Sequence, residues 1–321
     1  MDAPNKIIEG LVIKSTGTWY QVLDDDKKTW TCRIKGKFKT HGLKLTNPVT
    51  VGDRVCFVQE SGQETAMITT ILPRRNYIAR QSPSRKYQLH LLASNVDQAI
   101  VIVTIREPNV KIGFIDRFLL MTEPSDIPTI IVFNKIDVYD EDDMEYLDEI
   151  KTIYESIGYE TLCVSATENI GLQQFIDVLK DKTTLVAGHS GVGKSTLVNA
   201  IQPQLDIRTM EISDYSGKGQ HTTTFSEIHP LSFGGYIIDT PGIKELAFIE
   251  ITPEIVAHNF REIFAASAKC KYDDCKHLNE PFCAVKAAVT EGTISETRYT
   301  SYINILTDVQ ELNTWERHTG A

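Results

Sequence analysis

The sequence lacks a long apolar run. None of its apolar stretches reaches the ~18 residues that a membrane-spanning helix requires. The first ten residues, MDAPNKIIEG, also lack the basic start and the apolar segment of a secretion signal. We therefore expect a cytoplasmic protein without a membrane partner. Its 321 residues suffice for two or three domains, each with a core of its own.

Cysteine is scarce, and half of it lies near the C-terminus. Of six cysteines, three fall within 14 residues of one another and enclose a histidine: Cys270, Cys275, His277 and Cys283. Three thiolates and one imidazole at this spacing are typical of a closed, tetrahedral structural zinc site. The alternative, a disulfide with one spare thiol, is disfavoured in a reducing compartment. We predict one structural Zn²⁺, and not a catalytic zinc, because no ligand position stays open.

An overall basic charge is missing as well, since the net charge is −10. The distribution is uneven, however: residues 1–86 hold 15 Lys and Arg against 8 Asp and Glu, and the rest of the chain holds 18 against 35. Residues 27–44 and 74–86 contain no acid. Aromatic rings stack on bases while cations neutralise phosphates, and aromatics stand in or beside the basic region, namely Trp19, Tyr20, Trp30 and Phe38. We therefore predict RNA contacts, assigned to Lys35, Lys37, Lys39, Arg74 and Arg75.

Short strand patterns fill the first part of the chain. Five of them are separated by glycine or aspartate turns, at residues 7–15, 18–24, 28–36, 53–60 and 65–72. Five short strands in about 70 residues are typical of an OB-like barrel, a fold that often binds oligonucleotides. A purely structural barrel would show the same pattern. Residues 73–89, with two prolines and several cations, are predicted to be a linker.

Farther along, the rhythm changes to α/β. Apolar runs at residues 97–105, 128–134, 159–165, 183–188 and 235–240 predict buried strands, most of them separated by helices. From about residue 247 the chain is helical, and residues 295–313 carry one apolar helical stripe. The predicted class is thus multidomain: an OB-like barrel (1–72), an α/β domain with its basic linker (73–247) and a zinc-binding helical domain (248–321). No coiled-coil pattern is present, so we expect a monomer.

The stretch GHSGVGKS, residues 188–195, is a phosphate-binding loop. It follows the apolar TLVA and precedes a helical pattern, which is the strand-loop-helix context that the motif requires. Glycines let backbone N–H groups surround phosphate oxygens, and the helix N-terminus adds a favourable dipole. Lys194 would reach the β- and γ-phosphates, and Ser195 would ligate Mg²⁺.

Base recognition is predicted from NKID, residues 134–137, which ends another apolar strand. Asp137 can accept both N–H donors of guanine, which adenine does not offer, while Asn134 and Lys135 support the ring. SAT, residues 165–167, follows the next strand, where backbone N–H groups meet guanine O6. With Gly242 of DTPG, residues 239–242, as sensor of the γ-phosphate, the predicted nucleotide contacts are Asn134, Lys135, Ile136, Asp137, Ser165, Ala166, Gly188, His189, Ser190, Gly191, Val192, Gly193, Lys194, Ser195, Thr196 and Gly242.

Magnesium is expected to be shared between the phosphate loop and two later segments. Asp239 would hold the ion through water, and one threonine of HTTT, residues 221–224, would complete its coordination. We assign Thr223, with Thr222 and Thr224 as alternatives. Along this chain the motifs run NKID, SAT, phosphate loop, HTTT and DTPG. In the usual GTPase the phosphate loop comes first and NKxD comes late, so the order here is reversed. Since all these loops can still meet at one sheet edge, the order indicates a circular permutation.

At this point the sequence resembles the RsgA (YjeQ) family of circularly permuted GTPases that assemble the small ribosomal subunit. The matching stretches are NKID, GHSGVGKST, GKGQHTTT, DTPGIKE and CKYDDCKHLNEPFCAV, and the likeness covers nearly the whole chain. The resemblance implies GTP hydrolysis to GDP, a small-subunit partner with its rRNA, and turnover stimulated by the ribosome. One departure is Gln220, where an arginine would be expected.

The sequence lacks one residue that many GTPases use in hydrolysis. After DTPG, where many GTPases have a water-orienting glutamine, this chain has Ile243, which cannot hydrogen-bond to water. We predict that His221 positions the water instead, the alternative being a solvent-exposed switch histidine. Two other classes stay open: an ATP-dependent small-molecule kinase, disfavoured by NKID and SAT, and an RNA-binding zinc adaptor with a weakly active nucleotide site.

Overall fold

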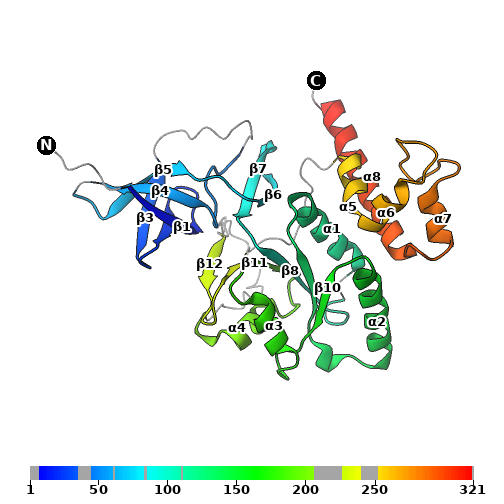
Figure 1. The fold of residues 1–321 in the computed structure, drawn as a ribbon, viewed down its shortest axis with the longest axis horizontal. Helices are drawn as coiled ribbons and strands as arrows, with labels where there is room; N and C mark the ends of the chain where they lie inside the picture. Colours follow the sequence, from blue (N-terminus) through cyan, green and yellow to red (C-terminus); the bar gives the residue numbers. More distant parts are fainter. Residues whose placement is uncertain are drawn as a thin grey trace, which may run out of the picture.

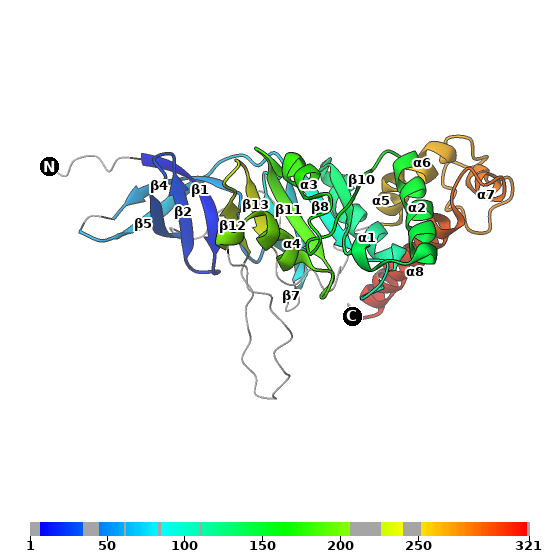
Figure 2. The same cartoon turned by 90° about the horizontal axis from the view of Figure 1, so that it is seen from below.

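The computed structural model describes residues 7–34, 45–60, 62–82, 85–109, 111–205, 226–239 and 252–319. Three units follow one another along the long axis of the molecule, with the barrel at one end and the C-terminal helices at the other (Figures 1 and 2). The α/β domain lies between them. Among the described helices, none combines the length and the apolar character that crossing a membrane would require.

A closed five-stranded barrel forms the N-terminal unit. Its strands are β1 (Ile7–Ser15), β2 (Tyr20–Asp24), β3 (Thr29–Ile34), β4 (Arg54–Gln59) and β5 (Thr65–Ile71). The hydrogen-bonded order β1-β2-β3-β5-β4 closes through a β1–β4 pairing, and β3 and β5 run parallel. This is the connectivity of an OB-like barrel, so the predicted fold of this unit is confirmed.

Two aromatics predicted to face RNA belong instead to the barrel core. Tyr20 is 1% exposed and Trp30 is 8% exposed. Both lie on the buried side of strands whose burial alternates with period two, and the indole of Trp30 donates to Asp24. Trp19, at 41% exposed, is accessible, and Phe38 lies outside the described residues.

The predicted linker is largely a β-hairpin, which corrects the prediction. Strands β6 (Tyr77–Ser82) and β7 (Arg85–Ser94) pair antiparallel. Ile78, Leu91 and Ala93 are buried, so the hairpin has an apolar side to pack. The prolines misled the prediction because neither β6 nor β7 contains one, so the pairing of these strands is not interrupted.

The central sheet has five parallel strands in the order β10-β9-β8-β11-β13. All five were predicted: β8 (Gln98–Val103), β9 (Thr129–Phe133), β10 (Glu160–Cys163), β11 (Thr183–Gly188) and β13 (Tyr236–Asp239). A short antiparallel strand, β12 (Glu227–Pro230), was missed. Its single bridge to β1, Lys14 with Glu227, joins the barrel and the central sheet into one sheet.

Four helices cover this sheet: α1 (Ile112–Thr122), α2 (Glu141–Ser156), α3 (Leu172–Leu179) and α4 (Lys194–Ile201). From β8 the chain crosses to β9 and then to β10, toward one edge of the sheet. From β10 it crosses back to β11 and then to β13, toward the other edge. Because such crossovers are right-handed, α1 and α2 lie on one face and α3 and α4 on the other. Covered on both faces, β8 and β9 are buried throughout, and all their residues except the first of each strand are apolar. The reversal falls between the neighbouring strands β8 and β11.

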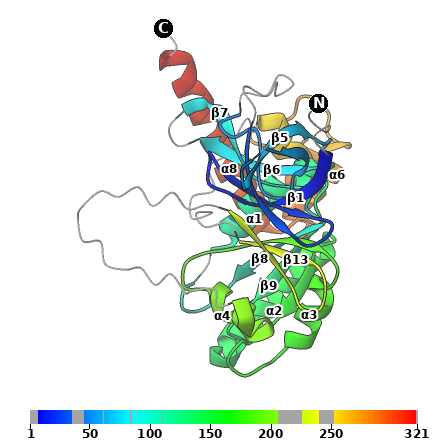
Figure 3. The same ribbon diagram turned by 90° about the vertical axis from the view of Figure 1, so that its left-hand side faces the viewer.

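The C-terminal unit consists of short helices packed on one long helix: α5 (Pro253–Asn259), α6 (Arg261–Ser267), α7 (Ala284–Thr290) and α8 (Glu296–Thr319). The predicted stripe on α8 is confirmed as packing, since Tyr302, Leu306 and Val309 are buried in this unit's core. Leu120 of α1 belongs to the same core, so the unit is seated on the α/β domain. Figure 3 views the molecule from the barrel end.

A buried arginine fastens this unit in place. Arg298 of α8 is 2% exposed and donates to Asp116 of α1 and, through two nitrogens at 2.7 and 3.0 Å, to Glu262 of α6. Tyr154 of α2 donates to the same Asp116 oxygen at 2.6 Å. Four helices from two units therefore meet at one charged group, and removing it would leave two carboxylates without their cation in a dry site.

We predict that Arg298→Met lowers the free energy of opening of α8 by about 3–5 kcal/mol, because it leaves the buried Asp116 and the largely covered Glu262 without a counter-charge. Hydrogen exchange of the α8 amides measures this quantity. The matched control is Arg117→Met, which breaks the more exposed pair between α1 and Asp308 of α8 and should cost at most about 1 kcal/mol. Equal losses in the two variants would contradict the assignment.

Candidate nucleotide site and metal centre

Three predicted nucleotide motifs lie at the carboxyl ends of parallel strands. Asn134–Asp137 follows β9, Ser165 follows β10, and the phosphate loop joins β11 to α4. In a parallel sheet these ends form one edge, and ligands bind where the crossover direction reverses, which here is between β8 and β11. The sheet therefore gathers the predicted residues at the place where an α/β fold binds its ligand.

The guanine motif touches the phosphate loop directly. The Asn134 side-chain amide donates to the Val192 carbonyl at 2.8 Å, and both residues are buried. Gly193 has φ +85°, and a Cβ on it would lie 2.5 Å from the Asn134 amide nitrogen. A side chain at position 193 would push the two motifs apart, which explains why glycine is required there. The other Asn134 side-chain atom, Oδ1, has no hydrogen-bond partner among the described residues.

The phosphate loop has the geometry of a backbone cradle. Gly191 and Gly193 both take positive φ, and α4 begins at Lys194, so free N–H groups of the first helical turn face the loop. Lys194 and Ser195 are half-buried, while Ser190 and Thr196 are exposed. Gly188 lies against β8, where a Cβ would come within 2.6 Å of the Ile102 carbonyl. The ring of His189 packs on Phe114 of α1, with centroids 4.3 Å apart.

Asp137 is prepared to accept hydrogen bonds. A hydrogen bond from Ser165, with further contributions that include Thr167, lowers the pKa of the Asp137 carboxyl below its usual value. The carboxylate is exposed and stays ionised under physiological conditions, as the recognition of two guanine N–H donors requires. Ile136 donates its backbone N–H to Val164, which ties NKID to the strand that carries SAT.

Lys135 turns back toward the loop that follows β8. Its φ is +64°, and its ammonium group donates to the Glu107 carbonyl at 2.6 Å. Ala166, the neighbour of Ser165, packs against the main core. The residues predicted around the base thus lie together, although they come from two different strands.

Part of the predicted magnesium and catalytic set lies outside the described residues. This applies to His221, Thr222, Thr223, Thr224 and Gly242. Asp239 ends β13, and its backbone pairs with Val186 of β11, so it stands near the start of the phosphate loop. The magnesium role of Asp239 stays a prediction.

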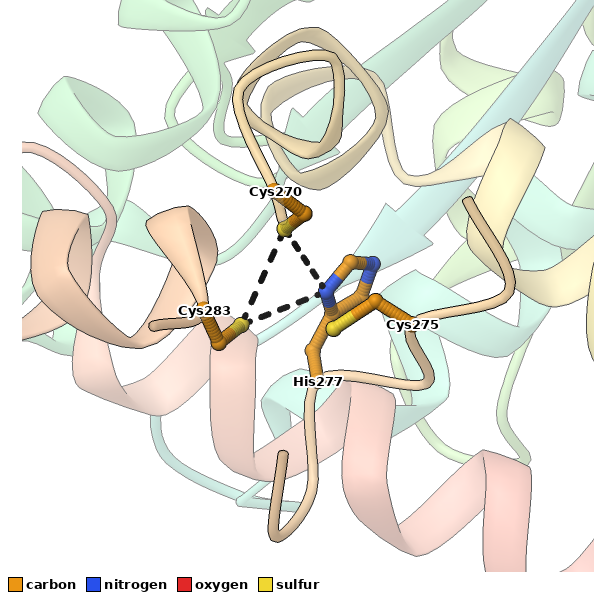
Figure 4. Close-up of side chains that lie close together, drawn as sticks. All are labelled: Cys270, Cys275, His277 and Cys283. Atoms are coloured by element: carbon orange, nitrogen blue, oxygen red, sulfur yellow. Dashed lines mark hydrogen bonds between the residues drawn. The ribbon is translucent and has the colours of Figure 1, made fainter. Parts of the chain in front are cut away.

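The four predicted zinc ligands converge (Figure 4). The ligand atoms of Cys270, Cys275, His277 and Cys283 all lie within 4.8 Å of one another. Cys270 Sγ is 3.9 Å from Cys283 Sγ, and His277 Nδ1 is 3.6 Å and 3.4 Å from these two sulfurs. Tetrahedral zinc with its usual bond lengths needs sulfur atoms about 3.8 Å apart, so this donor set fits the ion.

Neighbouring groups hold the ligand loop in shape. The Glu280 carboxylate accepts the backbone N–H groups of Lys276 and Leu278. From α8, the hydroxyls of Tyr299 and Tyr302 donate to the carbonyls of His277 and Lys276. Burial lowers the pKa of His277, which favours the neutral imidazole that a metal binds. The apolar stripe of α8 therefore also serves the metal loop.

The predicted RNA contacts divide into three groups. Lys35, Lys37 and Lys39 lie outside the described residues. Arg75 is 60% exposed and pairs with Asp97. Arg74, in contrast, makes a bidentate pair with the buried Asp53 at 2.6 and 2.7 Å and also donates to the Pro48 carbonyl. Its guanidinium is occupied in joining barrel and hairpin.

Two residues at the nucleotide site escaped the sequence analysis. Tyr139 accepts the Ile105 N–H at 2.7 Å and donates to the Asn134 carbonyl at 2.8 Å. Thr104 donates to the Pro108 carbonyl at 2.6 Å. No short motif marks either one, and the available signal was position alone: Tyr139 comes two residues after Asp137, and Thr104 directly follows a buried strand.

Comparison with known proteins covers almost the whole chain. The family models described as RsgA N-terminal domain and RsgA GTPase match residues 9–68 and 71–249. A protein of Bacteroides fragilis, named small ribosomal subunit biogenesis GTPase RsgA, is 50% identical over 95% of this chain and 98% of its own. Its namesake from Flavobacterium psychrophilum is 46% identical over 92% of each chain.

Solved structures agree with these sequence matches. YjeQ from Thermotoga maritima superposes with a TM-score of 0.76 at 33% identity, covering 95% of this chain and 99% of that one. YloQ, described as a circularly permuted GTPase, gives 0.70 at 31% identity, covering 95% and 96%. The motif order inferred from the sequence, the strand order of the sheet and these likenesses lead to one conclusion: the chain belongs to the RsgA family of circularly permuted GTPases.

Proposed function

We propose that this protein binds GTP with Mg²⁺, hydrolyses it to GDP and phosphate, and does so on the small ribosomal subunit late in its assembly. The observation that carries the proposal is the hydrogen bond from Asn134 to Val192, because it unites the guanine motif and the phosphate loop in one site. The names of the relatives support the ribosomal setting. The protein acts as a cytoplasmic monomer, and the subunit stimulates its turnover.

Guanine is read at the NKID end of this site. The Asp137 carboxylate accepts the two N–H donors of the base, and the backbone N–H of Ala166 meets its O6. The Ser165 N–H donates to the Ile170 carbonyl, so Ser165 serves the base through its hydroxyl, which donates to Asp137. The aliphatic part of Lys135 covers the ring. The buried Oδ1 of Asn134, without a partner among the described residues, is a polar atom that a bound ligand would satisfy.

The phosphates lie along the N-terminus of α4. Lys194 reaches the β- and γ-phosphates, and Gly242 senses the γ-phosphate. Ser195, Thr223 (or Thr222 or Thr224) and, through water, Asp239 would hold Mg²⁺, which when bound neutralises charge on the phosphate oxygens. His221 orients the attacking water, a task for which Ile243 has no polar group.

Ribosomal RNA is contacted by the barrel and by the segment that directly follows it. We retain Lys35, Lys37, Lys39 and the exposed Arg75 for this role and leave out Arg74, whose guanidinium is engaged with Asp53. We also retain units bounded near residues 72 and 247, with hairpin β6–β7 as part of the central unit. The C-terminal unit holds one structural Zn²⁺.

Asp137→Asn tests guanine recognition. The carboxylate accepts two donors, so its replacement should lower GTP affinity by between about 10²- and 10⁴-fold. The Asn amide should at the same time improve binding of xanthosine triphosphate, whose O2 accepts where guanine donates. Titration calorimetry with both nucleotides measures the expected loss of GTP affinity and gain of xanthosine triphosphate affinity. Unchanged GTP affinity in the variant would contradict the role of Asp137. If ATP competed with GTP equally in the wild type, an ATP-dependent enzyme would be favoured.

Cys270→Ser tests the zinc site. The variant should lose the one bound zinc per chain, and the loop between α6 and α7 should lose its protection from hydrogen exchange, since structural zinc contributes on the order of 10 kcal/mol to folding. Metal analysis by mass spectrometry gives the stoichiometry. Cys56→Ser, in the barrel, is the matched control and should keep its zinc. A zinc-loaded Cys270→Ser protein would contradict the ligand assignment.

His221→Ala tests the catalytic assignment. If the imidazole positions or activates water, turnover stimulated by small subunits should fall by about 10²- to 10⁴-fold while GTP affinity stays unchanged. Multiple-turnover phosphate release, with and without subunits, provides the measurement. Full stimulated turnover in the variant would remove His221 from the mechanism. Absence of turnover in the wild type would favour an RNA-binding adaptor.

A further inference from the structure

The loop that follows β8, residues 104–108, lies directly at the point where the crossovers reverse. Strands β8 and β11 are parallel neighbours, and β11 leads into the phosphate loop, so the two loops lie side by side at the sheet edge where α/β folds bind ligands. The Pro108 ring packs on the phosphate loop, 3.5 Å from where a Cβ on Gly191 would lie. The Pro108 end of this loop therefore lines the phosphate loop, although no sequence motif identifies it.

Three hydrogen bonds hold the loop. Thr104 closes it internally by donating to the Pro108 carbonyl at 2.6 Å. Lys135 donates to the Glu107 carbonyl at 2.6 Å. The Ile105 N–H donates to the Tyr139 hydroxyl at 2.7 Å, and this hydroxyl donates onward to the Asn134 carbonyl at 2.8 Å. Tyr139 is thus the one side chain in this set that both accepts from the loop and donates to NKID.

We propose that Tyr139 is a positioning residue for the guanine nucleotide. By fastening the loop to the backbone of Asn134, it holds the loop against the phosphate loop and sets the place of the Lys135 side chain before the nucleotide arrives. This inference rests on the proposed binding of GTP. It adds a residue that acts on the nucleotide indirectly, through the loop of residues 104–108 and through NKID.

The chemistry of the hydroxyl suits this role. Burial raises the pKa of Tyr139 to about 12, so the group stays protonated and keeps its donor. Ile105 is 6% exposed, and without the hydroxyl its N–H would lose its partner in a site that water reaches poorly. The phenol ring itself would still fill its space in a phenylalanine variant. Tyr139→Phe therefore removes the two hydrogen bonds of the hydroxyl and leaves the packing of the ring in place.

A second connection between the same two segments provides the control. Arg106 pairs with Asp140 at 2.6 Å and with Asp143 at 3.1 Å, and its side chain is 44% exposed. Solvent screens such a pair, so its contribution is small. Arg106→Met should therefore leave nucleotide binding nearly unchanged, even though it cuts a contact between the loop and the segment after NKID.

The experiment compares Tyr139→Phe with Arg106→Met in the full chain. We expect Tyr139→Phe to weaken GDP and GTP binding equally, by about tenfold, in a fluorescent-nucleotide titration. Turnover at saturating GTP should stay within about twofold of the wild type, so the loss falls on KM and not on kcat. The preference for GTP over xanthosine triphosphate should persist, in contrast to Asp137→Asn.

A second variant reaches the loop from its other side. Thr104→Val keeps the shape of a side chain that is fully buried and removes the bond to Pro108, so it should weaken both nucleotides in the same way. It carries the test if Tyr139→Phe does not fold. Nucleotide affinities within twofold of the wild type in both variants would overturn the inference, while tight GTP binding by the wild type would still uphold the proposed function. Failure of the wild type to bind GTP would overturn both.

Discussion

The structure depends on one constraint: loops from several strands must keep a fixed spacing around one ligand. The hydrogen bond from Asn134 to the Val192 carbonyl sets that spacing, and Gly193 permits it because a Cβ there would come within 2.5 Å of the amide. The site requires that these loops meet at one sheet edge. Their order along the sequence does not matter. A central sheet that begins at β8 and reaches the phosphate loop only at β11 therefore preserves the site while its motifs run in an altered order.

The C-terminal unit joins this scaffold through charged contacts as well as through apolar ones. Arg298 gathers α1, α2, α6 and α8 around one guanidinium. A second arginine, Arg261, pairs with Glu123, donates to the Gly158 carbonyl and lies over the ring of Tyr159. These two arginines therefore orient the unit on α1, α2 and the segments that directly follow them.

Much of this architecture could be predicted, and the failures have physical causes. Motifs with fixed chemistry, such as NKID, GHSGVGKS and the Cys/His set, impose spacing that can be read along the chain, and the structure brings each set together. Period-two and apolar patterns located ten strands but missed β12, whose four residues EIHP include a single apolar side chain. They also missed β6 and β7, because Pro73 and Pro83 beside these strands imitated a linker. Tyr20, Trp30 and Arg74 were misjudged because residue type does not reveal direction: the first two face a core, and the third meets the buried Asp53. Tyr139 was missed because its partners are backbone groups, which carry no sequence signature.

The pairing of β12 with the barrel has one more consequence. β12 ends the row of strands in the α/β domain, and β1 occupies its outer side through the bridge between Lys14 and Glu227. The barrel thereby shields a free sheet edge, which in isolation would be a template for pairing with other chains. A shortened protein without the barrel would expose this edge, and self-association of such a fragment would reflect lost shielding and not a failure of the remaining fold.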